Sequence, residues 1–192
     1  MALSLQLYLL LLAAVAAGRL LELVRSRRNQ ARLAHAGSVK SAEPAYKWMV
    51  ALHTGVLAGS ALEAVLSGRA FCPLLGSVSL ALFVASNLVR WWVIRTLGTR
   101  WNVEVMSASP KLGVITADGP YRWVRHPNYS AVFVEMLALP LIHSAFAVAL
   151  VGTALHILVL RHRIRLEESV LMQNAEWRTA FARRPRFFPG IA

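Results

Sequence analysis

The sequence predicts an all-α integral membrane protein, and three observations support this fold class. Hydrophobic residues make up 57% of the 192 residues, more than the roughly half that is usual in a soluble domain. The apolar residues form runs long enough to cross a bilayer, which takes roughly 20 residues per helix. Alternating short strands typical of a β-barrel are not evident, so helices must satisfy the backbone in lipid. We expect a single membrane domain over residues 1–192.

The basic residues explain the net charge of +12. They cluster between the apolar runs, as they do on the cytoplasmic face of membrane proteins, so we expect the membrane and not nucleic acid to be the partner. No obligate protein partner is indicated. Cys72 is the only cysteine, which excludes an intrachain disulfide framework and a thiolate metal cluster.

Three apolar runs in residues 1–97 are expected to be transmembrane helices. The first extends over residues 3–24; a cleavable signal peptide is the alternative, because residues 14–18 are small, although no basic segment precedes them. In the segment that follows, Gly37, Ser38 and Pro44 predict a loop or a short surface helix. The cations of this segment are Arg25, Arg27, Arg28, Arg32 and Lys40. The second and third runs extend over about residues 45–66 and 71–97, joined by a turn-like link.

Residues 98–192 form the second and more polar part of the chain. Residues 98–128 are polar and interrupted by glycine and proline, so a long helix is not expected there. The next apolar stretch, residues 130–160, is too short for two full crossings at roughly 20 residues each and too long for one. Because Pro140 lies near its middle, we expect a hairpin with short arms, bent at residues 140–145. The chain then has about five transmembrane helices.

The distribution of basic residues predicts one topology. The link near residue 70 and the tip of the hairpin carry few or no cations, whereas residues 25–40, residues 98–128 and the tail after residue 160 carry many. We therefore expect the N-terminus outside, and the active site and the C-terminus in the cytoplasm, of what is expected to be a bacterial inner membrane protein.

Ionisable residues within apolar runs are costly in lipid, so each is a candidate for a site. Arg19 and Glu22 lie three apart on one helix face, and a local ion pair is the simpler explanation. Arg90 is a candidate for substrate binding, with interfacial anchoring as the alternative. Glu135 is a second candidate and needs a partner, for which we expect an arginine of the inner segments. The scattered histidines predict no metal site.

The stretch GPYRWVRHPNYS, residues 119–130, has the composition of a small-ligand site. Pro127 restricts His126 to extended backbone and can itself begin a helix. The free N–H groups at such a helix start can accept an anionic group of a ligand. The rings of Tyr121, Trp123 and Tyr129 can face an aromatic ring or a cation.

A second polar cluster, RHRIRLEESV, occupies residues 161–170 at the exit of the hairpin. On a helix, Arg163 and Glu167 lie four apart on one face, and Glu167 can bind a ribose hydroxyl or an ammonium group. The alternative is a solvated charged helix end. Because both clusters adjoin the same hairpin, we expect residues 119–130 to fold against the double-glutamate helix end.

These residues resemble the isoprenylcysteine carboxyl methyltransferase family of integral membrane enzymes. The resemblance lies in GPYRWVRHPNY, a short apolar hairpin, RxxxEE and a tail ending near PRFFPGI, over roughly residues 98–192. RLLELVRSRRN, followed by Leu-His in the second helix, is similar to the bacterial branch, some members of which methylate polyketide-derived lipids such as alkylpyrones or alkylresorcinols.

The resemblance implies a single membrane methyltransferase domain over residues 1–192, with S-adenosylmethionine as cofactor and residues 98–192 as the cofactor-binding and catalytic region. It also assigns roles to individual residues. His126, Pro127, Asn128 and Tyr129 match the cofactor-binding His-Pro-x-Tyr of the family, and Tyr121 matches a tyrosine that precedes it. Arg163 matches the catalytic arginine near the methyl acceptor, and Glu167 matches a glutamate on the cofactor side. A backbone segment that lines the cofactor corresponds to Leu112, Gly113, Val114 and Ile115.

The implied activity is O-methylation of a lipidic acceptor that enters from the bilayer, either an isoprenylcysteine-type carboxylate or a phenolic or enolic hydroxyl. Three alternatives remain open. A phospholipid N-methyltransferase has a similar Arg-His-Pro segment. A sterol-type reductase would bind NADPH, but its pattern has a glutamate soon after the tyrosine, where this chain has Ser130, Ala131 and Val132. The third alternative is a membrane scaffold without catalytic activity.

Overall fold

The computed structural model describes residues 2–43, 45–106 and 116–187, and over these residues the protein is almost entirely helical. Long helices form at α1 (Leu3–His35), α2 (Ala45–Leu66), α3 (Pro73–Leu97) and α5 (Phe146–Leu171). Each of these four is long and apolar enough to cross a membrane. The shorter α4 (Pro127–Leu141) and α6 (Ala175–Phe181), with the 3-10 turns η1 (Gly98–Arg100) and η3 (Gly119–Arg122), complete the fold. The predicted class, an all-α integral membrane protein, is confirmed.

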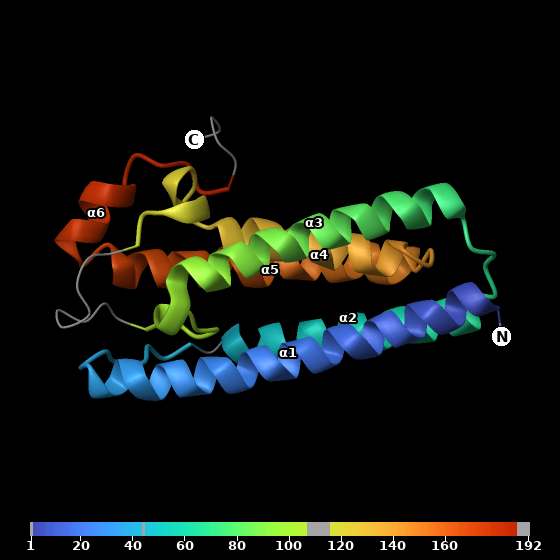
Figure 1. The fold of residues 1–192 in the computed structure, drawn as a ribbon, viewed down its shortest axis with the longest axis horizontal. Helices are drawn as coiled ribbons and strands as arrows, with labels where there is room; N and C mark the ends of the chain where they lie inside the picture. The colour runs from blue at the N-terminus through green and yellow to red at the C-terminus, as the bar shows by residue number, and fades with distance from the viewer. Residues whose placement is uncertain (1, 44, 107–115, 188–192) are drawn as a thin grey trace.

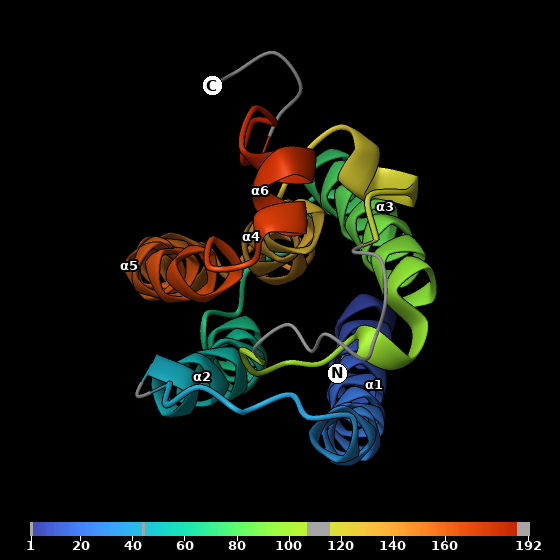
Figure 2. The same ribbon diagram turned by 90° about the vertical axis from the view of Figure 1, so that its left-hand side faces the viewer.

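The helices form a bundle in which α1 and α2 lie on one side and α3, α4 and α5 on the other (Figure 1). The view along the bundle shows α4 between α3 and α5 (Figure 2). One end of the bundle gathers the C-terminal ends of α1, α3 and α5, the start of α4, the turn η3 and the helix α6 (Figure 1). We call this the polar end, because its segments are those rich in arginine.

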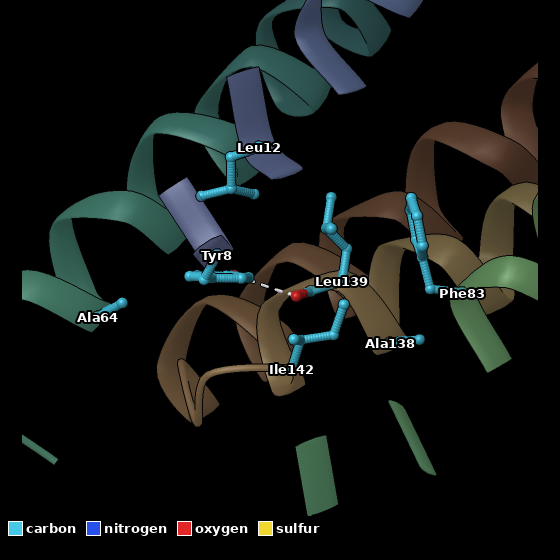
Figure 3. Packing of buried hydrophobic residues seen from close by; sticks show 7 residues of the cluster. All are labelled: Tyr8, Leu12, Ala64, Phe83, Ala138, Leu139 and Ile142. Atoms are coloured by element: carbon cyan, nitrogen blue, oxygen red, sulfur yellow. Dashed lines mark hydrogen bonds between the residues drawn. The ribbon is translucent and has the colours of Figure 1, made fainter. Parts of the chain in front are cut away.

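At the opposite end, an apolar cluster joins four helices (Figure 3). Tyr8 of α1 donates a hydrogen bond to the carbonyl oxygen of Leu139 in α4 at 3.1 Å. Around this bond pack Leu12, Ala64, Phe83, Ala138 and Ile142. The polar hydroxyl is thus satisfied inside an apolar environment, which stabilises the contact between α1 and α4.

The predicted hairpin is present, with its two arms unequal in length. The α4 helix has 15 residues and α5 has 26, because α5 continues beyond the apolar stretch through the polar cluster 161–170 as far as Leu171. Residues 142–145, within the predicted bend, connect the arms. Glu63 of α2 caps the start of α5 by accepting hydrogen bonds from the N–H groups of Ala147 and Val148, as an acidic group at a helix N-terminus should.

One expectation for the first loop was wrong. The basic segment after residue 24 belongs to α1, which continues without a break to His35, because arginine, glutamine, alanine and leucine are strong helix formers. The helix ends where Gly37 adopts a left-handed backbone with φ +90°. The N–H of Gly37 then bonds the carbonyl oxygen of Ala34 at 2.9 Å, a typical glycine termination.

Candidate functional site

A cavity of about 690 Å³ runs from the polar end into the interior of the bundle. Its walls include residues from the helices α1 to α5 and from the turn η3. At the polar end it is lined by side chains of both predicted clusters, and deeper in it is lined mainly by apolar side chains such as Leu57, Val132 and Leu160. The cavity therefore connects a polar ligand site to an apolar region between membrane-spanning helices.

The stretch 119–130 forms the predicted turn from loop into helix. Gly119 has φ +56°, and a Cβ atom there would come within 2.5 Å of the Thr96 hydroxyl oxygen, so the turn requires glycine. The 3-10 turn that follows leads to His126, which precedes the first helical residue of α4, Pro127. A proline at this position costs no hydrogen bond and fixes the start of the helix. The start of α4 is confirmed at the predicted residue.

Tyr129 connects the two predicted clusters through its hydroxyl group. Nε of Arg163 donates a hydrogen bond to the Tyr129 oxygen at 2.8 Å, and the hydroxyl itself donates to Oε2 of Glu167. The tyrosine thus lies between a cation and a carboxylate, on the wall of the cavity. The folding of the motif against the double-glutamate helix end is present as expected.

Arg163 is 6% exposed and is held by several acceptors from different parts of the chain. Its Nη1 contacts the sulfur of Met49 at 2.6 Å, its Nη2 donates to the carbonyl oxygen of Val103, and its Nε lies 3.4 Å from Oε1 of Glu43. These contacts fix the plane of the guanidinium group at the cavity wall, so its position is set before a ligand arrives.

Glu43 is an acidic partner of Arg163 that the sequence patterns did not reveal. Its side chain is 1% exposed, and its Oε2 accepts a hydrogen bond from the N–H of Val105 at 3.2 Å. Burial raises the pKa of the Glu43 carboxyl group, against the opposing effect of the Arg163 charge. Burial likewise raises the pKa of the Tyr121 hydroxyl, with a smaller contribution from Glu167, so Tyr121 stays protonated at neutral pH.

His126 and Glu168 anchor the C-terminal tail to the motif. Nε2 of His126 lies 3.0 Å from Oε1 of Glu168, and the guanidinium of Arg186 bonds both oxygens of the same carboxylate, at 3.1 and 2.7 Å. This bidentate pairing raises the pKa of Arg186. Two backbone bonds run in parallel: the N–H of Arg125 donates to the carbonyl oxygen of Pro185, and that of His126 to the carbonyl oxygen of Arg186, both at 2.9 Å. We call this arrangement the tail clasp.

We expect Arg186→Met to loosen the tail clasp, because it removes both charge-assisted hydrogen bonds to Glu168. Amide hydrogen exchange of Arg125 and His126, followed by mass spectrometry, should become about tenfold faster. Arg183→Met is the matched control, since Arg183 is exposed in the same tail and should leave exchange unchanged. Equal exchange in the Arg186→Met variant and the wild type would contradict an anchoring role for the pair.

The predicted cofactor-binding residues have different surroundings. Tyr121, His126, Asn128, Tyr129 and Glu167 line the cavity. Pro127 is buried in the first turn of α4 and does not contribute to the lining. Leu112, Gly113, Val114 and Ile115 lie outside the described residues. Trp123, expected to face a ligand, instead meets Trp92 edge to face, with ring centroids 5.6 Å apart, at the surface of the bundle.

Several buried polar atoms in the cavity wall lack a hydrogen-bond partner within the described part of the chain, among them Oδ1 of Asn128 and Oγ1 of Thr116 near the polar end. Buried polar groups in native proteins are rarely unpaired, so these two oxygens are candidates for contacts with a polar ligand. The rings of Tyr121, Trp177 and Phe181 line the same cavity and offer apolar surface to a ligand.

Arg90 and Glu135, the predicted acceptor contacts, belong to one ion-pair network between α1, α3 and α4. Arg19 of α1 bonds Oε1 of Glu135 at 2.5 Å and Oε1 of Glu22 at 2.7 Å. Arg90 of α3 pairs with both oxygens of Glu22. The partner of Glu135 is thus Arg19, and the expectation of an arginine from the inner segments was wrong. Arg90 lines the main cavity, whereas Glu135 lines only a small side cavity, and their role in acceptor binding stays a prediction.

The network is balanced, with two arginines and two glutamates. Nη2 of Arg19 also bonds the side-chain oxygen of Asn87 at 3.2 Å, which gives Asn87 the polar partner that a membrane-spanning helix requires. These side chains connect α1 to α3, and Arg19, Glu22 and Arg90 also line the cavity.

The fold and the cavity define a class: a helical membrane protein with a polar ligand site at one end that continues between its spanning helices. The profile of the isoprenylcysteine carboxyl methyltransferase family matches residues 79–173. The eukaryotic intramembrane Ras methyltransferase, an isoprenylcysteine carboxyl methyltransferase of known structure, has a similar fold, with a TM-score of 0.56 and 20% sequence identity. That match covers 70% of this chain and 48% of the larger protein.

Two bacterial proteins are also similar. An uncharacterized protein of Bacillus subtilis, YpbQ, is 27% identical over 166 residues, 85% of this chain and 96% of the relative. An uncharacterized protein of Haemophilus influenzae is 30% identical over 95 residues, 49% of this chain and 54% of the relative. Residues 79–173 thus match the isoprenylcysteine carboxyl methyltransferase family, and the likeness to the solved membrane methyltransferase is one of fold.

Proposed function

We propose that this protein transfers a methyl group from S-adenosylmethionine to an oxygen of a lipidic acceptor. The observation that carries the proposal is the single cavity in which Tyr129, Glu167 and Arg163 form a polar wall and apolar side chains of the spanning helices form the remainder. A water-soluble cofactor and a lipid can react with each other where a polar surface and an apolar surface adjoin in one cavity. In this proposal the polar end faces the cytosol, which supplies the cofactor.

The residues at the polar end fit the chemistry of S-adenosylmethionine. Glu167 can accept hydrogen bonds from ribose hydroxyls or an ammonium group. The side-chain oxygens of Asn128 and Thr116, which have no partner among the described residues, can accept from amino groups. Tyr121 and Phe181, whose rings meet at 85° with centroids 6.4 Å apart, can pack against a purine. When bound, the cofactor supplies a methyl group on a sulfonium, which an oxygen nucleophile takes by in-line displacement.

Arg163 is the proposed catalytic residue. Its buried charge would orient an acidic oxygen of the acceptor, a carboxylate or an enolic or phenolic hydroxyl, and favour its ionised, nucleophilic form. Glu43 and Tyr129 hold the guanidinium in place. Positioning and electrostatics can supply the acceleration without a covalent enzyme intermediate.

Calorimetric binding of S-adenosylhomocysteine to the detergent-purified protein tests the cofactor. We expect the wild type to bind and Glu167→Ala and His126→Ala to bind at least about tenfold more weakly, since each loses a contact or an anchor of the site. Glu176→Ala, an exposed glutamate in α6, is the control and should bind as the wild type does.

NADPH, titrated in parallel, separates the proposal from a reductase. Binding of NADPH in place of S-adenosylhomocysteine would replace the proposal with a reductase. Failure of folded protein to bind either ligand would favour the scaffold.

A further inference from the structure

Two histidines lie together in the cavity, deeper in the bundle than Arg163. His53 of α2 and His156 of α5 meet edge to face, with ring centroids 5.8 Å apart, and both line the cavity. His156 is 3% exposed, and neither of its ring nitrogens has a hydrogen-bond partner among the described residues. An unpaired buried imidazole costs free energy, so a ligand in the cavity is the natural source of its hydrogen bonds.

The hydrogen bonding of His53 decides which of its nitrogens can accept. Its Nδ1 lies 2.7 Å from the carbonyl oxygen of Met49, which can only accept, so Nδ1 carries the proton. In the neutral ring, Nε2 is then an acceptor. His156 offers one donor and one acceptor. A hydroxyl group both donates and accepts, so it matches this pair of rings better than an ion or a hydrocarbon does.

The histidine pair lies on the same side of the cavity as Arg163. Met49 joins the two, since its sulfur contacts Arg163 and its carbonyl oxygen bonds His53. His156 precedes Arg163 by two turns of α5, about 10 Å along the helix. The wall around it is apolar, with Val132, Val159 and Leu160 among the lining residues. A lipid that reaches Arg163 with its reacting oxygen therefore extends past the two rings.

We propose that His53 and His156 form a subsite for a hydroxyl group on the hydrophobic part of the methyl acceptor. The inference rests on the proposed function, because it assigns the cavity to the acceptor. It narrows the acceptor to lipids that carry a second oxygen beyond the one that is methylated, such as a dihydroxylated ring with an alkyl chain. A plain alkyl carboxylate would leave His156 unpaired, and a site with unpaired polar groups discriminates against such a ligand.

Binding of two probes that differ by one hydroxyl group tests the subsite. The probes are an alkylphenol and an alkylresorcinol with the same pentadecyl chain, titrated into full-length protein in lipid nanodiscs. We expect the wild type to bind the resorcinol about tenfold more tightly, the equivalent of one to two buried hydrogen bonds. His156→Phe should bind the two probes equally, and His53→Phe should reduce the difference. His162→Phe, an exposed histidine on the same helix, should preserve it.

S-adenosylhomocysteine binding in the same preparations separates this inference from the proposed function. His156→Asn keeps a hydrogen-bond donor and an acceptor, so it should retain part of the preference for the resorcinol. This result would show that the loss in His156→Phe comes from the missing hydrogen bonds and not from altered packing. Equal affinities in the wild type, or a preference that survives in both His156→Phe and His53→Phe, would overturn the subsite even where S-adenosylhomocysteine binds. A preference that depends on His156 without S-adenosylhomocysteine binding would overturn the methyltransferase and leave the subsite intact.

Discussion

Replacing Arg163 with leucine is expected to lower the rate of methyl transfer by about 10²–10³-fold, the effect of losing one preorganised electrostatic contact in an active site. Leucine keeps an apolar side chain at this position but cannot stabilise the negative charge of the acceptor oxygen. The measurement is transfer of labelled methyl from S-adenosylmethionine into the lipid extract of membranes that contain the protein. S-adenosylhomocysteine binding, measured alongside, shows whether the cofactor site survives.

Two further variants define what the arginine contributes. Arg163→Lys keeps the charge but loses the planar group that contacts Tyr129 and Val103 together, so it should recover only part of the rate. Arg161→Leu removes an exposed cation from the same helix and should leave the rate unchanged. Full turnover by folded Arg163→Leu protein would exclude Arg163 from the catalytic step.

Glu22→Leu is expected to lower the free energy of unfolding by about 3–5 kcal/mol, the range for removing one member of a buried ion pair. The variant leaves Arg19 and Arg90 with only Glu135 between them, inside the bundle. Thermal or denaturant-induced unfolding in detergent, followed by tryptophan fluorescence, measures the change. Arg28→Met, an exposed position of α1, is the control.

The double variant Glu22→Leu/Arg90→Met tests whether charge balance explains the loss. It leaves Arg19 paired with Glu135 and replaces the other pair with apolar side chains, so most of the lost stability should return. A double variant less stable than Glu22→Leu alone would show that Arg90 stabilises the bundle by other contacts.

The parts of the fold that follow from local chemistry could be predicted from the sequence. The start of α4 at Pro127 follows from the fixed φ angle of proline, and the second helix, with bounds at residues 45 and 66, follows from its apolar run. The shared face of Arg163 and Glu167 follows from the helical period. By contrast, the end of α1 was misjudged, because a charged helix that leaves the bilayer looks like a polar loop in composition.

The parts of the site that depend on distant contacts could not be predicted. Glu43 and Arg163 are separated by 120 positions in the chain, and Arg19 and Glu135 by 116; no periodicity relates such residues. The tail clasp is a similar case. The sequence shows Glu168 as one of two adjacent glutamates, but whether it pairs with Arg186 or with an arginine nearer in the sequence depends on the path of the tail. Tertiary structure alone selects among many possible partners of equal charge.

The continuous α1 helix has a consequence for which changes in length the chain tolerates. Its inward-facing residues recur at alternating intervals of four and three, as in a heptad stripe: Tyr8, Leu12, Val15, Arg19, Glu22, Ser26 and Asn29. The first three pack in the apolar cluster, the next two belong to the ion-pair network, and Ser26 and Asn29 bond the backbone of Val103 and Trp101. Inserting one residue would rotate everything beyond it by about 100°. The loop that contains Trp101 and Val103, beside Arg163, is therefore held in position by the rotational alignment of these α1 residues, more than by the identity of the lipid-facing leucines.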